Sequence, residues 1–122
     1  MNKIILTGNI VNDTVSREKL AKNSIAVRRD FKNEDGEYDT DFFEIIAFGH
    51  QADYMKNYIC KGDKVEISGK MQIRQYQTQD GINRKAYEVI IESIGTLIKA
   101  NQDNIKPQDE GFEEVYDDDI PF

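Results

Sequence analysis

The sequence predicts one all-β domain with a single helix, followed by an acidic tail. Three observations predict this class: segments of alternating apolar and polar residues between residues 2 and 91, one segment with helical spacing, and a change of composition after residue 100. Alternation with a period of two is typical of half-buried strands. We therefore divide the chain into a domain over residues 1–100, a flexible acidic linker over 101–116 and a terminal peptide over 117–122.

The first two strands are predicted over residues 2–10 and 24–31. Ile4, Leu6 and Ile10 fall on one face of the first strand, and Gly8 indicates a bend or the close approach of another backbone. A turn over residues 33–36, with the sequence Asn-Glu-Asp-Gly, follows the second strand. One side of that second strand carries Ile25, Val27, Arg29 and Phe31.

The third strand, residues 42–48, is apolar on both faces except at Glu44. A helix is predicted over residues 51–60, and Gly62 is its left-handed cap. The apolar residues with helical spacing are Ala52, Met55, Tyr58 and Ile59.

The fourth strand, residues 64–74, has the clearest alternation in the chain, with apolar residues at the odd positions from Val65 to Ile73. A polar loop over residues 77–83 leads to a fifth strand over 85–91, in which Tyr87, Val89 and Ile91 alternate with Ala86, Glu88 and Ile90. Three strands, a helix and two strands within about 100 residues are typical of the OB fold, a five-stranded Greek-key barrel.

The formal charge of −7 belongs entirely to the end of the chain. Residues 101–122 contain eight acids against Lys106 alone, whereas residues 1–100 contain 15 Lys and Arg against 15 Asp and Glu. An acidic total argues against a nucleic-acid partner only if the charge is spread over the domain. Because the domain of residues 1–100 is neutral, local basic patches on it can still bind a nucleic acid.

The remaining bulk features indicate a protein of a reducing compartment. Cys60 is the only cysteine, so no disulfide can form within the chain. The opening residues lead directly into a patterned strand, and no long apolar segment precedes Gly8, so we expect neither a signal peptide nor a membrane association.

Catalysis is difficult to assemble from this sequence, and we expect no enzyme, cofactor or metal site. His50 is the only histidine, and neither a triad nor a zinc site follows from it and Cys60. Asp39, Asp41 and Glu44 admit a metal cluster as in a barrel nuclease, but Asp41 and Glu44 point to opposite faces of a strand. A solvated loop and strand edge is the simpler interpretation.

Aromatic rings in basic surroundings indicate a different function. Phe31 lies beside Arg28, Arg29 and Lys32. Phe42 and Phe43 are opposite in phase, so one of the two rings must leave the core. Tyr76 continues the polar face of the fourth strand after Lys70, Gln72 and Arg74, and Arg84 and Lys85 follow beyond the loop. The aromatic rings lie on strands two to four, the surface with which OB barrels bind oligonucleotides. Rings stack on bases and cations follow phosphates in that mode.

Several segments, in order, resemble the bacterial-type single-stranded DNA-binding proteins. They are residues 1–9 (MNKIILTGN), 41–49 (DFFEIIAFG), 58–70 (YICKGDKVEISGK), 74–76 with 80–81, and the final residues 117–122 (DDDIPF). The resemblance covers residues 1 to about 97 and then the terminal peptide.

The resemblance implies a homotetramer of OB folds that binds single-stranded DNA without sequence specificity in replication, recombination and repair. It assigns base stacking to Phe31, Phe42, Phe48 and Tyr76, with Phe43 turned inward or to an interface. The accompanying backbone contacts would come from Arg28, Arg29, Lys32, Lys70, Arg74, Arg84 and Lys85. An OB-fold replication accessory that acts mainly through protein contacts is the alternative.

The resemblance also gives the tail a role in recruiting replication, recombination and repair proteins. Asp117, Asp118 and Asp119 would meet a basic rim on the partner, while Ile120, Pro121 and Phe122 fill an apolar pocket. The implied location is the bacterial cytosol or nucleoid, or the host cytoplasm for a phage-encoded member. The chain departs from many relatives in lacking tryptophan, in a short charged segment over 11–23, and in a brief linker that suits a phage or plasmid member.

Overall fold

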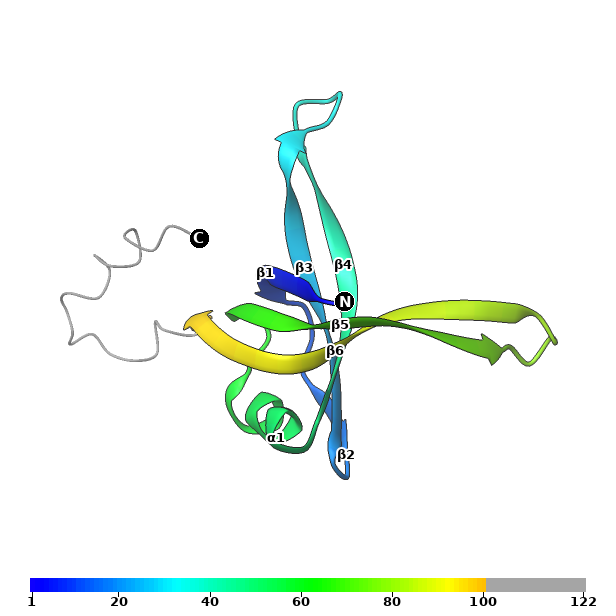
Figure 1. Cartoon of the computed structure of the whole chain (residues 1–122). Helices are drawn as coiled ribbons and strands as arrows, with labels where there is room; N and C mark the ends of the chain where they lie inside the picture. Colours follow the sequence, from blue (N-terminus) through cyan, green and yellow to red (C-terminus); the bar gives the residue numbers. More distant parts are fainter. Residues whose placement is uncertain (101–122) are drawn as a thin grey trace.

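The computed structural model describes residues 1–100, and the predicted linker and docking peptide, residues 101–122, lie outside the described residues. Figure 1 shows a small barrel from which two long hairpins project. The elements follow the chain in this order: β1 (Ile4–Ile10), β2 (Val15–Arg17), β3 (Leu20–Lys32), β4 (Tyr38–Phe48), α1 (Gly49–Tyr58), β5 (Lys64–Gln77) and β6 (Asn83–Ile98).

The sheet order β1-β5-β6-β4-β3 closes into a barrel because β1 also pairs with β3, through Asn9↔Ala26 and Ile10↔Ile25. The pairing of β4 with β6 is parallel, whereas the other strand pairs are antiparallel. This closed five-stranded barrel with its helix between β4 and β5 is the OB fold that the sequence predicts.

The barrel core consists of the alternating apolar residues of the strands and one face of the helix. Its fully buried members include Ile25, Ile45, Met55, Ile67 and Val89. Ile4 and Leu6 pack against this cluster, as their shared phase with Ile10 predicts. These side chains are the bulky branched residues that fill small barrels, so burial of apolar surface stabilises this region.

Two glycines permit the close packing of the strands. A Cβ atom on Gly8 would lie 2.2 Å from the carbonyl oxygen of Ala26, and one on Gly69 would lie 2.1 Å from that of Ile90. Neither backbone oxygen can move away without breaking the sheet. The close approach predicted at Gly8 is therefore confirmed.

The helix differs from its prediction in its bounds and at one residue. It begins at Gly49 rather than Gln51 and ends at Tyr58 rather than Cys60, and the Phe48 position that caps it provides no side-chain hydrogen bond. Ala52, Met55 and Ile59 are buried as expected, but Tyr58 is exposed. Its ring lies beside that of Tyr54, with the ring centroids 5.4 Å apart and the ring planes tilted by 38°. No helix within residues 1–100 is long and apolar enough to cross a membrane.

A buried ion pair fixes the end of the domain to the turn after the helix. The Asp63 side chain is fully buried and accepts hydrogen bonds from Lys99 Nζ (2.6 Å), from the backbone N–H of Ala100 (2.8 Å) and from that of Cys60 (2.8 Å). Burial alone would raise the pKa of Asp63, but the Lys99 ammonium and the two backbone donors outweigh it and lower the pKa below its ordinary value.

Four of the five predicted strands are longer than the sequence predicts, the first is shorter by two residues at its start, and β2 was not predicted. β2 is a short strand on the outer edge of β3, within the charged segment between the first two predicted strands. β3 extends to Lys32 and β4 begins at Tyr38. Likewise, β5 extends to Gln77 and β6 begins at Asn83. These extensions form the β3–β4 hairpin and the β5–β6 hairpin that leave the barrel in Figure 1.

Ile73 is the clearest correction on the strands. Its phase with Val65, Ile67 and Met71 predicts an inward side chain, but 54% of its surface is exposed. The reason is its position on the β5–β6 hairpin, which projects beyond the barrel in Figure 1, so that no other strand or helix of residues 1–100 covers it.

Candidate nucleic-acid interface

The β3–β4 hairpin presents two unshielded aromatic rings. Phe31 lies near its outer end and is 84% exposed, while Phe42 lies closer to the barrel and is 66% exposed. The β3–β4 register shifts between Arg28 and Lys32, so the strict alternation that would align Phe31 with Ile25 and Val27 is interrupted before the ring.

The two adjacent phenylalanines of β4 separate as their phases require. Phe43 packs against the barrel core opposite Ile25, and Phe42, opposite Ala26, points away from it. Phe48, at the end of β4, is about half exposed beside the start of α1. Each of the three predicted stacking rings on β3 and β4 thus has an accessible face.

The fourth predicted stacking residue, Tyr76, lies on the β5–β6 hairpin and is 43% exposed. The register places Arg84 directly opposite it. The guanidinium of Arg74 lies 5.4 Å from the centre of the Tyr76 ring, within the range of a cation–π interaction. The two hairpins therefore each combine rings with cations.

Two of the predicted phosphate-binding arginines are already ion-paired within the protein. Arg29 donates to both oxygens of Asp41 (2.9 and 3.0 Å), and Arg74 donates to Glu88 (2.9 Å). The hydrogen bond to Asp41 raises the pKa of Arg29 and lowers that of Asp41. These two guanidiniums have less positive charge to offer a phosphate than the other cations.

Two of the acids that the sequence offers for a metal cluster are engaged within the hairpin. The Asp41 carboxylate binds Arg29, and Asp39 lies 3.9 Å from the same guanidinium while accepting from Asn33. Among residues 1–100, no cluster of His, Cys, Asp and Glu has the arrangement of a metal site. These acids serve the hairpin's structure.

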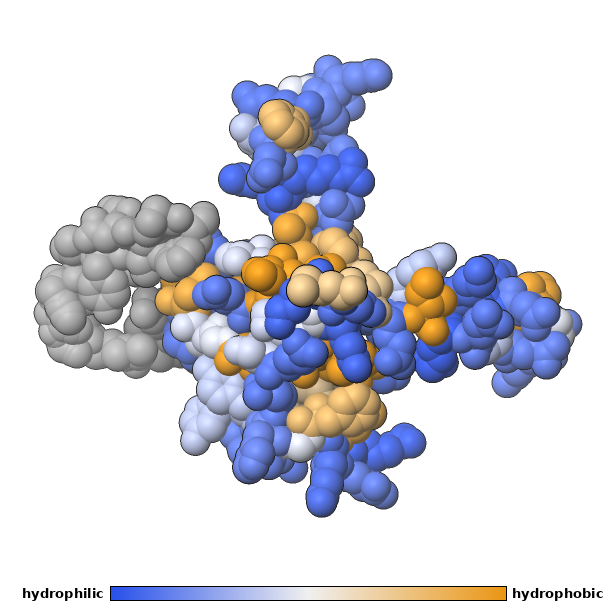
Figure 2. Space-filling model, viewed as in Figure 1, coloured by the Kyte–Doolittle hydropathy of each residue, from blue (hydrophilic) through white to orange (hydrophobic). Residues whose placement is uncertain are grey.

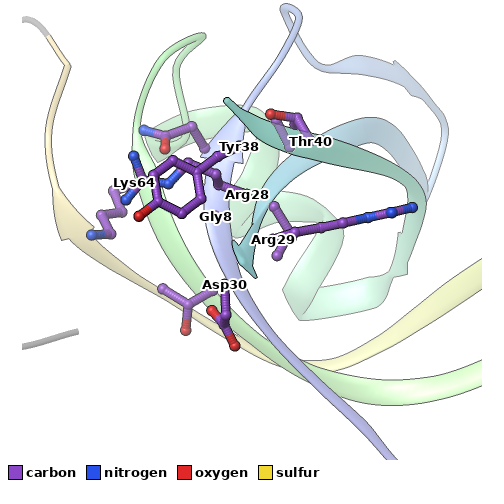
Figure 3. Close-up of a pocket in the computed structure, with 11 residues that line it drawn as sticks. Gly8, Arg28, Arg29, Asp30, Tyr38, Thr40 and Lys64 are labelled. Atoms are coloured by element: carbon purple, nitrogen blue, oxygen red, sulfur yellow. The ribbon is translucent and has the colours of Figure 1, made fainter. Parts of the chain in front are cut away.

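An open groove of about 580 Å³ lies between β1 and the base of the β3–β4 hairpin (Figure 3). Tyr38 and Lys64 line it, and sequence reasoning missed both. The guanidinium of Arg28 lies 4.7 Å from the centre of the Tyr38 ring and Lys32 Nζ lies 5.8 Å from it. The sequence did contain a clue: an aromatic just across a predicted turn from a basic strand end.

The predicted cations do not form one continuous surface. Arg28 and Lys32 gather at Tyr38 on one hairpin, whereas Lys70, Arg74, Arg84 and Lys85 lie along the other. Arg84 and Lys85, which the sequence predicts to contact the DNA backbone, point to opposite faces because they are adjacent in one strand. The arrangement can stack flat groups and neutralise phosphates on two projecting hairpins.

The strand order, the closed barrel and the position of α1 define an OB-fold protein. Comparison with known sequences then identifies the family. The chain belongs to the single-strand binding protein family, whose family model matches residues 1–97.

Individual relatives match the chain over nearly its whole length. Single-stranded DNA-binding protein 3 of Streptococcus agalactiae serotype V is 32% identical and covers 100% of this chain and 99% of its own length. Single-stranded DNA-binding protein 2 of Clostridium acetobutylicum is 34% identical, with 100% of both chains covered. A solved structure of a Plasmodium falciparum SSB in complex with ssDNA has a TM-score of 0.72 at 22% identity, covering 80% of this chain and 95% of that one. That last match shows the shared fold.

Proposed function

We propose that this protein binds single-stranded DNA without sequence specificity and has no catalytic activity of its own. The observation that supports the proposal most strongly is the exposure of Phe31 and Phe42 on a hairpin with Arg28 and Lys32. Stacking of an exposed aromatic ring on another flat apolar surface is favourable, and every DNA base offers such a surface. The names of the relatives, and the ssDNA complex of the Plasmodium protein, support the same ligand.

The bound strand would contact both hairpins. Phe31 and Phe42 on one, Phe48 at the end of β4, and Tyr76 on the other would stack on successive bases. Phosphates would pair with the remaining cations, Arg28, Lys32, Lys70, Arg84 and Lys85, and less with Arg29 and Arg74, which already hold carboxylates. Without tryptophan, the stacking energy of each base falls toward the lower end of about 1–3 kcal/mol.

The protein would assemble as a homotetramer, as its family resemblance implies. One feature of the fold supports self-association. β1 pairs with β5 from Ile4 to Asn9, but with β3 only at Asn9 and Ile10, so one edge of β1 lacks a strand neighbour within residues 1–100. Ile5 on that strand is exposed. An unpaired strand edge is a ready site for another chain.

We assign the cellular role to replication, recombination and repair in the bacterial cytosol or nucleoid, or in the host cytoplasm for a phage-encoded member. Residues 117–122 would recruit the partner enzymes: Asp117 to Asp119 meet a basic rim, and Ile120, Pro121 and Phe122 enter an apolar pocket. The domain of residues 1–100 is neutral while the tail carries −7, so the tail would also compete weakly with DNA for the basic hairpins.

Alanine substitutions of the stacking rings test the DNA-binding proposal. Phe31→Ala, Phe42→Ala and Tyr76→Ala should each weaken oligo-dT binding by about 1 kcal/mol or more, which is about fivefold in the dissociation constant. Tyr58→Ala, an exposed aromatic on α1, is the matched control and should leave the affinity unchanged. Wild-type affinity in all three ring variants, measured by fluorescence anisotropy, would contradict the proposal.

Deletion of residues 117–122 tests the docking role of the tail. We expect loss of pull-down of replication and repair proteins, while oligo-dT affinity stays equal or increases because an acidic competitor has been removed. A control that replaces only Phe122 with Ala retains the charge and should lose partners without changing DNA affinity. A weaker affinity for DNA after the deletion would place the tail in the DNA site instead.

A further inference from the structure

The β5–β6 hairpin has two solvent-facing sides that carry different residues. Its register is regular from Gly69↔Ile91 to Gln77↔Asn83, so residues directly opposite each other share a side and alternate along each strand. One side presents Tyr76 opposite Arg84, and the Arg74–Glu88 ion pair lies on that same side. This is the side that the proposed DNA path uses.

The second side presents Ile73 directly opposite Tyr87. Tyr87 is 58% exposed and Ile73 is comparably exposed, although both belong to the phase that enters the core closer to the barrel, where Val89 is fully buried. The family resemblance assigns no role to either residue. An exposed pair of this size on a hairpin that is otherwise mostly hydrophilic (Figure 2) indicates a contact surface.

The charges of this second side favour an anion. Lys85 follows the same phase as Tyr87 and lies opposite Gln75. Between Met71 and Gln77 on β5, and between Asn83 and Val89 on β6, this side contains no Asp or Glu. A ring, an aliphatic side chain and an unopposed cation together match a base stacked on the ring with its phosphate at the ammonium.

We propose that Tyr87, with Ile73 and Lys85, forms a second base-stacking site, so that one DNA strand passes around the β5–β6 hairpin and contacts both of its sides. This inference rests on the proposed ssDNA-binding function. Arg84 and Lys85 point to opposite sides of the hairpin, so each would provide a cation beside the aromatic residue on its own side. The alternative occupant of this surface is a second copy of the chain.

Tryptophan substitution gives a direct test because the protein contains no tryptophan of its own. Three single variants, Tyr87→Trp, Tyr76→Trp and Tyr58→Trp, each carry one fluorescent reporter. On addition of oligo-dT long enough to pass around the hairpin, we expect quenching of the first two and not of the Tyr58→Trp control. Quenching at position 76 without quenching at 87 overturns the second site and leaves the proposed function intact, whereas quenching at neither position contradicts both.

Affinity and mass measurements complete the test. Tyr87→Ala should raise the dissociation constant for long oligo-dT about fivefold or more, and Tyr87→Phe, which retains the ring, should restore the affinity. A short oligo-dT that reaches only the Tyr76 side should bind both variants as it binds the wild type. Unchanged affinity of Tyr87→Ala for the long oligonucleotide, or a lower oligomeric mass of Tyr87→Ala in light scattering without DNA, overturns the proposal; in the second case the surface joins copies of the chain.

Discussion

The barrel and the two hairpins are built from the same strands, yet they use their residues in opposite ways. Along β3, Ile25 is fully buried in the barrel whereas Phe31 is exposed on the hairpin; along β5, Ile67 is buried and Ile73 is exposed. A strand that continues beyond the barrel loses the second layer that would cover it. Its apolar side chains then become available to a ligand. One part of the strand therefore stabilises the barrel, and another part of the same strand offers a binding surface.

The largest effect should come from the buried ion pair of the barrel. Asp63→Ala leaves Lys99 facing a cavity and removes the acceptor of two backbone N–H groups. Removing one partner of a buried pair costs about 3–5 kcal/mol, and the partial exposure of Lys99 places the expected loss in unfolding free energy near the lower end. Urea denaturation measures it. The folded fraction should bind oligo-dT normally, and a selective loss of DNA affinity would break the division between barrel and hairpins.

The same pair predicts a pH dependence of stability. The pKa of Asp63 is lowered in the folded protein, so its contribution is present above the unfolded pKa of about 3.9 and is lost as the pH falls through the folded value. The gap in thermal unfolding midpoint between wild type and Asp63→Asn should therefore be widest near neutral pH and shrink below about pH 4. A gap that stays constant down to pH 2 would show that the carboxylate charge is unimportant.

A smaller effect on stability is expected at the barrel's close contact between β1 and β3. Gly8→Ala places a methyl group 2.2 Å from the Ala26 carbonyl oxygen and should cost about 1–3 kcal/mol through overpacking. Gly95→Ala is the control, because its Cβ meets nothing within 4 Å. Equal unfolding midpoints for the two variants would contradict the close approach.

On the hairpin, two arginines should separate stability from binding. Arg74→Gln leaves the buried Glu88 carboxylate without its partner and should lower the unfolding midpoint, whereas Arg84→Gln, for which residues 1–100 show no ion pair, should leave it unchanged. Arg84→Gln should instead reduce the salt dependence of oligo-dT binding by about 0.7 in slope, the share of one phosphate. The opposite assignment of the two effects would refute the pairing with Glu88.

The sequence predicts the barrel well because, in the barrel, the alternation of apolar and polar residues matches the alternation of buried and exposed side chains. Val65 and Ile67 show this on one strand, and the opposite phases of Phe42 and Phe43 correctly require one ring to leave the core. Alternation says nothing about where the barrel ends. For that reason Ile73 was assigned an inward side chain, and the length of both hairpins and the short strand β2 were not predicted.

The candidate site was predictable as a set of residue types but not as a surface. Partners far apart in sequence, such as Asp63 with Lys99 or Arg74 with Glu88, become visible only when strands are in register. Those contacts decide which cations remain available for phosphates. Lys64 and Tyr38 in the groove were missed for the same reason, since they lie on different strands, β5 and β4, that only the fold brings to one groove.

The most direct test of the central claim is a salt titration of oligo-dT binding to the full chain. Phosphate neutralisation by the hairpin cations releases counterions, so the logarithm of the association constant should fall linearly with the logarithm of salt concentration, by about 0.7 for each phosphate contacted. The residual affinity at high salt should then fall further in Phe31→Ala, because stacking is insensitive to salt. A line without slope, or the same high-salt affinity in wild type and Phe31→Ala, would contradict binding of single-stranded DNA by the two hairpins.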